Sequence, residues 1–361
     1  MSKGKVYIIA EAGVNHNGDM ELARKLVREG AEAGVNAVKF QTFRPENVVT
    51  QTAEKAAYQK VTTGTQESQL EMLRKLTLQD KDYLELQDLC RECGVDFIST
   101  PFDSDSLRFL TTELDMPFIK VPSGEITNAP FLLEIANTGK PVVLSTGMAT
   151  LGEVERALAV LAYGYLKEDF PSSYQDAQNV YVSTEGQNVL RNKVKLLHCT
   201  TQYPAAASQA NLKAMETMEK AFGLPVGYSD HTEGIAIPVA AAARGAVIIE
   251  KHFTMDKTLP GPDHKASLEP GELKNMVKAI RAVEQSIGSG VKLPASEEVP
   301  NISIVRKSLV ATKDIAKGER FSLKNITAKR DGTGVSPMDI WHVLGQKAER
   351  AYSRDEKIVI S

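Results

Sequence analysis

Residues 224–264 have the sequence LPVGYSDHTEGIAIPVAAAARGAVIIEKHFTMDKTLPGPDH, and the rest of the chain repeats their plan. Two short apolar runs, LPVGY and AVIIE, flank a segment of small residues with helical periodicity. Ser229, Asp230 and His231 follow the first run, and Glu250 at the end of the second is followed by Lys251 and His252. Two successive strands that end in chemically capable side chains predict the rim of an active site.

Eight strand-like runs, each followed by a helix pattern, occupy the first 290 residues. The strands are apolar throughout rather than alternating, which is typical of a parallel sheet covered on both faces. Eight such units favour a closed (β/α)₈ TIM barrel over an open doubly wound sheet, and no GxGxxG turn follows the first strand. Asp19 is expected to cap the first helix and Gly34 to end it. The strand-like runs are 6–10, 36–43, 95–102, 116–125, 141–148, 194–204, 224–228 and 246–250.

Two excursions and a C-terminal module depart from this regular pattern. Residues 44–78 follow the second strand at the catalytic rim and are long enough to act as a lid. Residues 166–193 are polar and lie at the opposite rim, as a surface insertion. The predicted domains are a barrel over 1–290, a linker rich in Pro, Ser and Glu over 291–304, and a small domain of short strands and turns over 305–361.

Composition sets limits on the partners and the compartment. The formal net charge of −3 over 361 residues gives no reason to expect nucleic acid or an anionic membrane surface as a partner. No apolar run approaches the roughly 20 residues that span a bilayer, and the N-terminus lacks the features of a signal peptide. A cytoplasmic enzyme is therefore expected. Cys90 and Cys93 have CxxC spacing at the end of a helix pattern, without the second pair that a zinc site needs, and Cys199 lies in a core strand.

Every predicted strand ends in polar side chains, where a barrel of this kind carries its catalytic groups. A lone lysine or histidine at a strand end is more often a solvated charge or a structural residue, but solvation does not explain the pattern at all eight ends. The strand-end residues are Glu11, Lys39, Gln41, Ser99, Thr100, Lys120, Ser123, Glu125, Ser145, Thr146, His198, Thr200, Thr201, Tyr203, Ser229, Asp230, His231, Glu250 and His252.

These side chains suit an anionic substrate and a metal ion. Lys39 and Lys120 supply cations, and the hydroxyls of Thr100, Ser123, Ser145 and Thr201 supply donors for a small anion that carries phosphate and carboxylate groups. His231 and His252 end neighbouring strands, so the pair is expected to bind Mn²⁺, Mg²⁺ or Zn²⁺ with water in the other positions. Glu11 and Glu125 are available to orient or deprotonate water, whereas His264 lies beyond the strand end and is expected to be structural.

The chain resembles the sialic acid synthase family over essentially its whole length, and nine motifs in the same order carry the resemblance. They are IIAEAGVNHNG (8–18), VKFQTF (38–43), STPFD (99–103), IKVPSGE (119–125), VLSTGMAT (143–150), LHCTTQYP (197–204), GYSDHT (227–232), EKHFT (250–254) and PGPDHKASLEP (260–270). The segments SLVATKDIAKGE (308–319) and NITAKR (325–330), with the LG at 344–345, resemble the antifreeze-like (SAF) domain of β-clip type that ends members of this family.

The resemblance implies an activity, a cofactor and an assembly. It implies condensation of phosphoenolpyruvate, N-acetylmannosamine and water to N-acetylneuraminate and phosphate by C–O cleavage, with legionaminate synthesis from 2,4-diacetamido-2,4,6-trideoxymannose as the alternative. A non-enzymatic SAF-type binding protein is the remote alternative. The resemblance also implies a divalent metal, Mn²⁺ first with Mg²⁺ or Co²⁺ as alternatives, and a domain-swapped homodimer.

The resemblance also assigns roles to individual residues. Phosphoenolpyruvate would contact Lys39, Thr100, Lys120, Ser123, Ser145 and Ser229, with Thr201 beside its phosphate. The metal ligands would be His231 and His252, and the sugar would contact Gln41, Glu125, Tyr203, Asp263 and Arg330 of a partner chain. The chain departs from the family pattern at Thr201, where some members have Asn, and at the loop 329–334, which has the sequence KRDGTG instead of KRPGNG.

Overall fold

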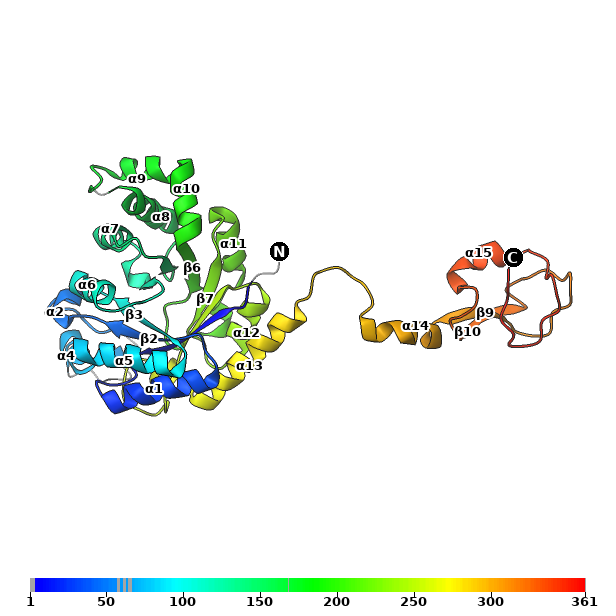
Figure 1. The fold of residues 1–361 in the computed structure, drawn as a ribbon, viewed down its shortest axis with the longest axis horizontal. Helices are drawn as coiled ribbons and strands as arrows, with labels where there is room; N and C mark the ends of the chain where they lie inside the picture. Colours follow the sequence, from blue (N-terminus) through cyan, green and yellow to red (C-terminus); the bar gives the residue numbers. More distant parts are fainter. Residues whose placement is uncertain (1–3, 57–58, 61–62, 64–66, 168, 361) are drawn as a thin grey trace. The chain divides into compact units, whose positions relative to one another are not determined.

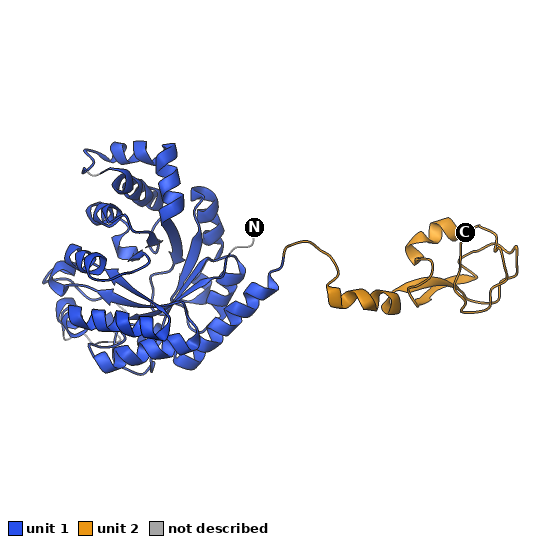
Figure 2. Cartoon of the chain, viewed as in Figure 1, with its two compact units in different colours: residues 1–288 blue, residues 289–361 orange. Residues whose placement is uncertain are grey.

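A computed structural model describes residues 4–56, 59–60, 63, 67–167 and 169–360, and the chain divides into two compact units. The first unit runs from Met1 to Gly288 and the second from Ser289 to Ser361 (Figure 2). The predicted lid over 44–78 includes residues 57–58, 61–62 and 64–66, which lie outside the described part of the chain. Among the described residues, no helix combines the length and the apolar character that crossing a membrane requires.

The first unit is the predicted (β/α)₈ barrel, nearly closed. Its eight parallel strands pair in the order β3-β2-β1-β8-β7-β6-β5-β4 (Figure 1). β3 and β4 lie side by side, but no strand pairing joins them among the described residues. The strands are β1 (Tyr7–Gly13), β2 (Ala37–Thr42), β3 (Asp96–Pro101), β4 (Ile119–Val121), β5 (Val142–Ser145), β6 (Val194–Cys199), β7 (Val226–Asp230) and β8 (Ile248–His252).

Helices cover the outside of the strands, and local sequence signals set their ends. The Asp19 side chain accepts hydrogen bonds from the first-turn amides of α1, and Gly34 ends that helix at φ 85°, as predicted. The α5 helix ends in the same way at Gly94, with Cys90 buried at its end. The helices of this unit are α1 (Met20–Ala33), α2 (Pro45–Val48), α4 (Gln69–Lys75), α5 (Asp80–Cys93), α6 (Ser104–Thr112), α7 (Ala129–Asn137), α8 (Leu151–Leu166), α9 (Tyr174–Tyr181), α10 (Thr184–Lys193), α11 (Lys213–Phe222), α12 (Ala236–Ala243) and α13 (Pro270–Ser286).

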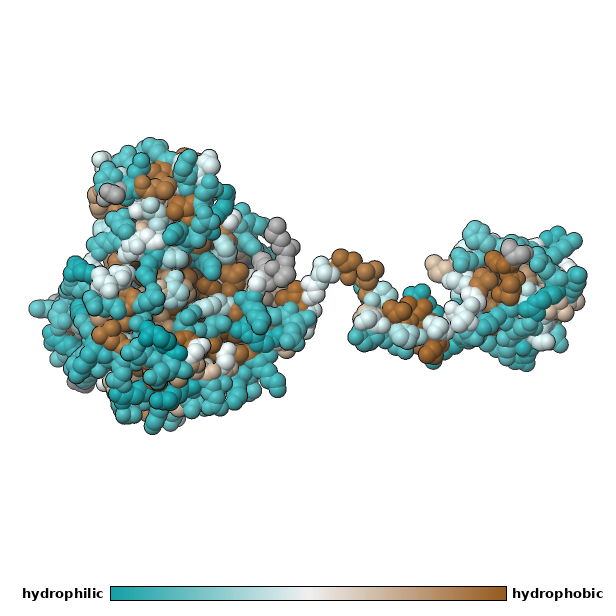
Figure 3. All heavy atoms as spheres, in the orientation of Figure 1, coloured by the Kyte–Doolittle hydropathy of each residue, from teal (hydrophilic) through white to brown (hydrophobic). Residues whose placement is uncertain are grey.

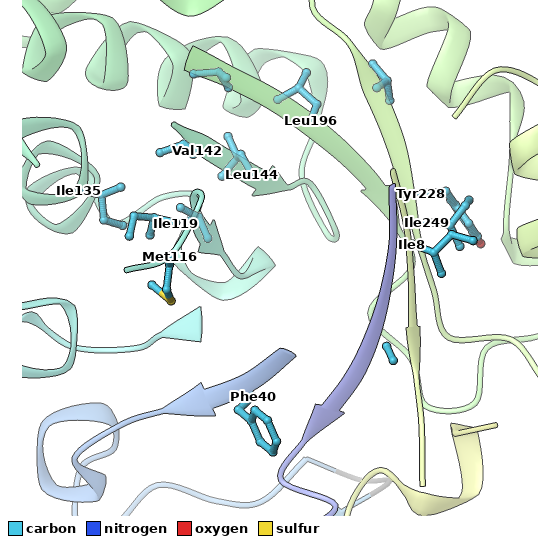
Figure 4. Close-up of a cluster of buried hydrophobic side chains, with 14 of the residues drawn as sticks. Ile8, Phe40, Met116, Ile119, Ile135, Val142, Leu144, Leu196, Tyr228 and Ile249 are labelled. Carbon is cyan, nitrogen blue, oxygen red and sulfur yellow. The ribbon is translucent and has the colours of Figure 1, made fainter. Parts of the chain in front are cut away.

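Strand side chains alternate between the barrel interior and the helix layer, because successive residues of a strand point to opposite faces. Ile9, Ile98 and Ile248 belong to the small interior cluster. Ile8, Tyr228 and Ile249 belong to the large core between strands and helices, and Figure 4 shows their side chains together beside β1 and the strands next to it. Positions that continue the interior series at the strand ends, such as Glu11 and His252, therefore face into the mouth of the barrel.

The two excursions both contain helices. The segment 44–78 carries α2 and α4, and its apolar side chains form a small cluster of their own with Val14 of β1's following turn and Phe102 after β3. The segment 166–193, expected only as a polar surface insertion, forms α9 and α10. Their buried residues Ala177 and Leu190 belong to the main core, because both helices pack against α8.

The second unit has a core of its own. β9 (Lys307–Ala311) and β10 (Ile326–Arg330) pair antiparallel, and short bridges and α15 (Ile340–Val343) complete the unit. The predicted linker holds α14 (Val299–Val305), which buries none of its residues. Apolar residues gather over α14 and the segment before it in Figure 3, and five of them, which we call the linker strip, are each more than half exposed. The linker strip comprises Val291, Leu293, Val299, Ile304 and Val305.

Candidate active site

A cavity of about 270 Å³ lies at the carboxyl ends of the barrel strands, where the parallel register brings the polar strand ends together. All the predicted site residues line it except two, Glu125 and Arg330. The lining residues from the strands and the turns after them are Glu11, Lys39, Gln41, Thr100, Lys120, Pro122, Ser123, Gly124, Ser145, Cys199, Thr201, Tyr203, Ser229, His231, Glu250, His252, Pro262 and Asp263.

Two buried lysines and two buried carboxylates form the floor of the cavity. Lys39 Nζ lies 2.6 Å from Glu11 Oε2 and 3.5 Å from Glu250 Oε2, and Lys120 Nζ lies 3.6 Å from Glu250 Oε1. Burial alone would raise the pKa of Glu250, but the two lysines outweigh it and hold that pKa at about 2. Burial would likewise lower the pKa of Lys39, but Glu11 and Glu250 outweigh it and raise the pKa. Lys39 therefore stays a cation inside the cavity.

Lys120 is the less compensated of the two cations. Burial lowers its pKa, and the opposing attraction of Glu250 is too weak to restore it. Its ammonium group donates to Ser145 Oγ at 2.8 Å, while that of Lys39 donates to Thr100 Oγ1 at 3.1 Å. A bound anion would supply the missing negative charge to Lys120, which is the property expected of a phosphate- or carboxylate-binding lysine.

Hydroxyl groups converge around Gly147, in the turn after β5. The Gly147 amide donates to Ser123 Oγ at 3.0 Å, and Ser123 Oγ lies 3.1 Å from Cys199 Sγ. Thr201 Oγ1 is buried and has no hydrogen-bond partner among the described residues. A Cβ at position 147 would lie only 2.3 Å from that oxygen. Position 147 therefore has room for glycine but not for a larger residue unless its neighbours move. The Thr201 hydroxyl next to it is free to donate to a ligand.

The two predicted metal ligands lie next to each other in the cavity, at the ends of the paired strands β7 and β8. The rings of His231 and His252 have centroids 5.4 Å apart, and Tyr203 stacks 4.1 Å from His231. His231 Nδ1 donates to Thr200 O at 2.6 Å, which leaves Nε2 as the acceptor. Burial lowers the pKa of His231 to about 4 and that of His252 well below its usual value, so both imidazoles are neutral.

This donor set fits a divalent cation. His252 Nδ1 is buried, has no hydrogen-bond partner among the described residues, and lies 4.0 Å from Asp263 Oδ2. No cluster of three or more His, Cys, Asp and Glu side chains is placed to hold a metal in the described part of the chain. Two neutral imidazoles leave the other positions of a bound cation to water, to a substrate oxygen or to the nearby Asp263 carboxyl group, whose pKa burial raises to about 7.

One wall of the cavity is apolar, and most of it comes from the segment 44–78. Met72 of α4 and Leu76, the residue after that helix, are buried there, and Leu73 is half-buried beside them. We call this the lid wall, and its lining residues are Val14, Phe43, Val48, Met72, Leu73, Leu76 and Phe102. The amides of Gln59 and Gln69 also line the cavity on this side. One end of the cavity is therefore cationic and the other apolar with amide groups.

Two of the residues predicted to belong to the site, Glu125 and Arg330, do not line the cavity. Glu125 falls in the short helix η1 (Ser123–Glu125), and its carboxylate accepts a hydrogen bond from Asn128 at 2.7 Å, outside the cavity lining. Arg330 ends β10 in the second unit and is exposed. The neighbouring Asp331, which lies in the KRDGTG loop, accepts from Thr333 and pairs with Lys357 at 3.0 Å, so its charge is already compensated.

Glu250 received no role from the sequence, and the segment 44–78 was predicted as a lid without naming the side chains that line the cavity. Glu250 was identified only as a strand-end residue, although its spacing of two from His252 places both on the interior face. Cys199, expected in the core, is buried but also lines the cavity. His264 is buried outside the cavity and hydrogen-bonds Thr254 Oγ1 at 2.7 Å.

Comparison with known proteins identifies the family of this chain. Residues 26–292 match the NeuB family model, and residues 306–359 match the SAF domain. The chain is 49% identical to N,N'-diacetyllegionaminic acid synthase of Campylobacter jejuni (98% of this chain, 99% of that protein) and 45% identical to the Legionella pneumophila protein of the same name (94% and 90%). A crystal structure of N-acetylneuraminic acid synthetase from Leptospira borgpetersenii is similar with a TM-score of 0.65 and 32% identity, covering 83% of this chain and 91% of that one. The chain belongs to the NeuB family.

Proposed function

We propose that the protein is an N,N'-diacetyllegionaminate synthase. It condenses phosphoenolpyruvate with 2,4-diacetamido-2,4,6-trideoxymannose and water, and it releases phosphate. The observation that carries this proposal is the two-ended cavity, with buried Lys39 and Lys120 at one end and the lid wall at the other. The similarity to two legionaminic acid synthases supports this acceptor over N-acetylmannosamine, which the sequence alone had placed first.

The cationic end suits phosphoenolpyruvate. Two lysines and the hydroxyls of Ser123, Ser145 and Thr201 offer charge-assisted hydrogen bonds to a phosphate and a carboxylate. Lys39 is already paired with Glu11, whereas no carboxylate of the described residues lies closer than 3.6 Å to Lys120. We assign Lys120 and the free Thr201 hydroxyl to the phosphate for this reason.

The apolar end suits a deoxygenated, doubly acylated sugar. The legionaminate precursor carries a methyl group at C6 and an acetamido group at C4, where N-acetylmannosamine has hydroxyl groups. Met72, Leu73 and Leu76 offer contact to methyl groups but no partner for a buried hydroxyl, whose desolvation would then be uncompensated. The Gln69 side chain, which also lines the cavity, is available to an acetamido group.

The chain's own residues bind, orient and protonate the reactants. A divalent cation at His231 and His252, Mn²⁺ first, would supply Lewis-acid activation of the sugar aldehyde. C3 of phosphoenolpyruvate forms the new C–C bond, water adds at C2, and the bond from C2 to the phosphate oxygen breaks. Burial raises the pKa of Glu11, and Gln41 donates to its carboxylate at 3.1 Å. Burial also raises the pKa of Asp263, to about 7, so Glu11 and Asp263 are the two carboxyl groups of the cavity lining that can hold or move the proton of the attacking water.

We further propose that the protein acts as a domain-swapped homodimer. The linker strip exposes five apolar residues in the first part of the second unit, which is unfavourable unless another surface covers them. In the proposed dimer, Arg330 of the partner subunit contacts the acceptor sugar. Mixing a His252→Ala chain with an Arg330→Ala chain tests this, because only an arginine that acts across subunits lets the mixed dimer form one intact site. Recovery of activity on mixing supports the swap, and no recovery contradicts it.

Phosphate release with isotope labelling tests the reaction itself. The purified protein with Mn²⁺, phosphoenolpyruvate and the diacetamido sugar is expected to release one phosphate per sugar acid formed. If the C–O bond breaks, ¹⁸O placed in the bridging position of phosphoenolpyruvate appears in phosphate. Label in the sugar acid contradicts this bond cleavage. No phosphate release with either sugar contradicts synthase activity and favours a binding protein.

A further inference from the structure

A buried ion pair lies behind the two histidines, on the helix side of the barrel. Asp230 and Lys251 are partners in the β7–β8 register, and their charged atoms lie 2.6 Å apart. Neither side chain has any solvent exposure. Tyr228 and Ile249, two residues earlier on each strand, belong to the core outside the barrel, so the alternation of the strands places the pair on that outer face.

The same alternation places the histidines on the inner face, one residue further along each strand. Ser229 and Glu250, one residue before the pair, meet inside the barrel, where Ser229 Oγ donates to Glu250 at 2.8 Å. His231 and His252, one residue after it, line the cavity. Each imidazole is thus attached to the backbone immediately beyond one member of the ion pair.

Further hydrogen bonds fix this corner in three dimensions. Asp230 accepts from the Thr232 hydroxyl at 2.9 and 3.0 Å and from the Thr232 amide at 3.2 Å. Lys251 also donates to the Thr232 carbonyl. The backbone on both sides of His231 is therefore tied to β8, one residue away from His252.

A fully buried ion pair adds little net stability, because the cost of removing both charges from water offsets their attraction. Its position suggests a geometric role. We propose that Asp230 and Lys251, with Thr232, are positioning residues that fix the separation and orientation of the His231 and His252 imidazoles and so set the affinity for the metal ion. We call these three residues the strand clamp. The inference rests on the two-histidine metal site of the proposed function.

A double substitution separates positioning from stability. Asp230→Asn with Lys251→Met removes both charges at nearly constant volume, so the fold is expected to be retained. The ionic link between the strands is then lost, and Mn²⁺ binding is expected to weaken by about 10–100-fold, as is common when residues that support metal ligands are changed. Free Mn²⁺ is measured by electron paramagnetic resonance on the full-length protein without substrates, and the melting temperature is recorded in parallel.

Leu132→Ala is the control for lost stability. Leu132 is fully buried in α7, so this variant loses stability through a core cavity without contacting the clamp. It is expected to bind Mn²⁺ within about threefold of the unchanged protein. A comparable loss of Mn²⁺ affinity in this variant would assign the effect to general destabilisation and overturn the inference, as would a folded double variant with unchanged affinity.

Thr232 gives a milder test in case the double variant does not fold. Thr232→Val removes the hydroxyl that donates to Asp230 and is expected to weaken Mn²⁺ binding. Thr232→Ser keeps this hydroxyl and is expected to bind Mn²⁺ as tightly as the unchanged protein. Equal affinities for these two variants contradict the clamp. Because no substrate is present, these measurements do not depend on catalysis. A protein that binds Mn²⁺ through both histidines but makes no sugar acid contradicts the proposed function and leaves the strand clamp standing. Mn²⁺ binding that is unchanged in His231→Ala and in His252→Ala contradicts both the metal site and the strand clamp.

Discussion

Replacing Gly147 by alanine is expected to impair phosphoenolpyruvate binding while leaving the fold intact. The added Cβ would lie 2.3 Å from Thr201 Oγ1, 2.7 Å from Ser123 Oγ and 2.9 Å from Cys199 Sγ, whereas ordinary contacts begin at 3.4 Å. The Thr201 hydroxyl must therefore move by about 1 Å, which is enough to break a hydrogen bond to a bound phosphate. Overpacking of this kind costs about 1–3 kcal/mol of folding free energy, a modest loss for a unit of this size.

The effect on the ligand is larger. A hydrogen bond to a charged group contributes about 1.5–3 kcal/mol, so losing one and weakening another costs about 3 kcal/mol, or about 100-fold in affinity. Isothermal titration calorimetry with phosphoenolpyruvate measures this directly, and circular dichroism checks the fold. Gly124→Ala is the matched control, because Gly124 lines the same cavity and a Cβ there meets nothing within 4 Å. A folded Gly147→Ala protein with unchanged affinity would refute the assignment of this corner to phosphate.

Three further predictions follow from the site and its surroundings. His252→Ala should keep the fold but lose metal-dependent turnover, and unchanged activity in a Mn²⁺ titration would remove this residue from the metal site. Leu73→Gln should lower kcat/KM for the diacetamido sugar about tenfold while sparing the affinity for phosphoenolpyruvate, whereas the exposed Leu84→Gln should change neither. Burial lowers the pKa of His16 from 6.5 to about 4, so the unfolded chain binds more protons between those values and stability falls by about 3 kcal/mol as the pH drops from 6.5 to 4. His16→Gln should flatten that part of a plot of unfolding free energy against pH, and an unchanged slope would contradict it.

The barrel and most of its catalytic rim are predictable from the sequence, because parallel strands impose a simple geometry. Each apolar run that ends in a polar residue places that residue at the same rim, so Lys39, Lys120 and His252 come together without any knowledge of the helices. Strand periodicity also separates Glu250, which faces the cavity, from Lys251, which faces the helices. The same periodicity would have given Glu250 its place beside the two lysines.

Loops and turns were less predictable, since their side-chain directions depend on tertiary contacts. Glu125 follows a polar strand end like the others, but the turn η1 directs its carboxylate to Asn128. The lid wall forms because the short helix α4 lines the cavity at the barrel mouth. The sequence of 44–78 has no strand or long-helix periodicity that predicts this wall. The role of Arg330 depends on how two units and two chains assemble, which a residue pattern does not specify.

The most direct test of the proposed function is a comparison of the two acceptor sugars with one enzyme preparation. With Mn²⁺ and saturating phosphoenolpyruvate, kcat/KM is measured for 2,4-diacetamido-2,4,6-trideoxymannose and for N-acetylmannosamine, and the products are identified by mass spectrometry. The lid wall predicts a preference of at least about 100-fold for the diacetamido sugar, because its C6 methyl group replaces a hydroxyl that Met72, Leu73 and Leu76 cannot pair, and its C4 acetamido group can bond the Gln69 side chain. Equal values, or a preference for N-acetylmannosamine, would contradict the account.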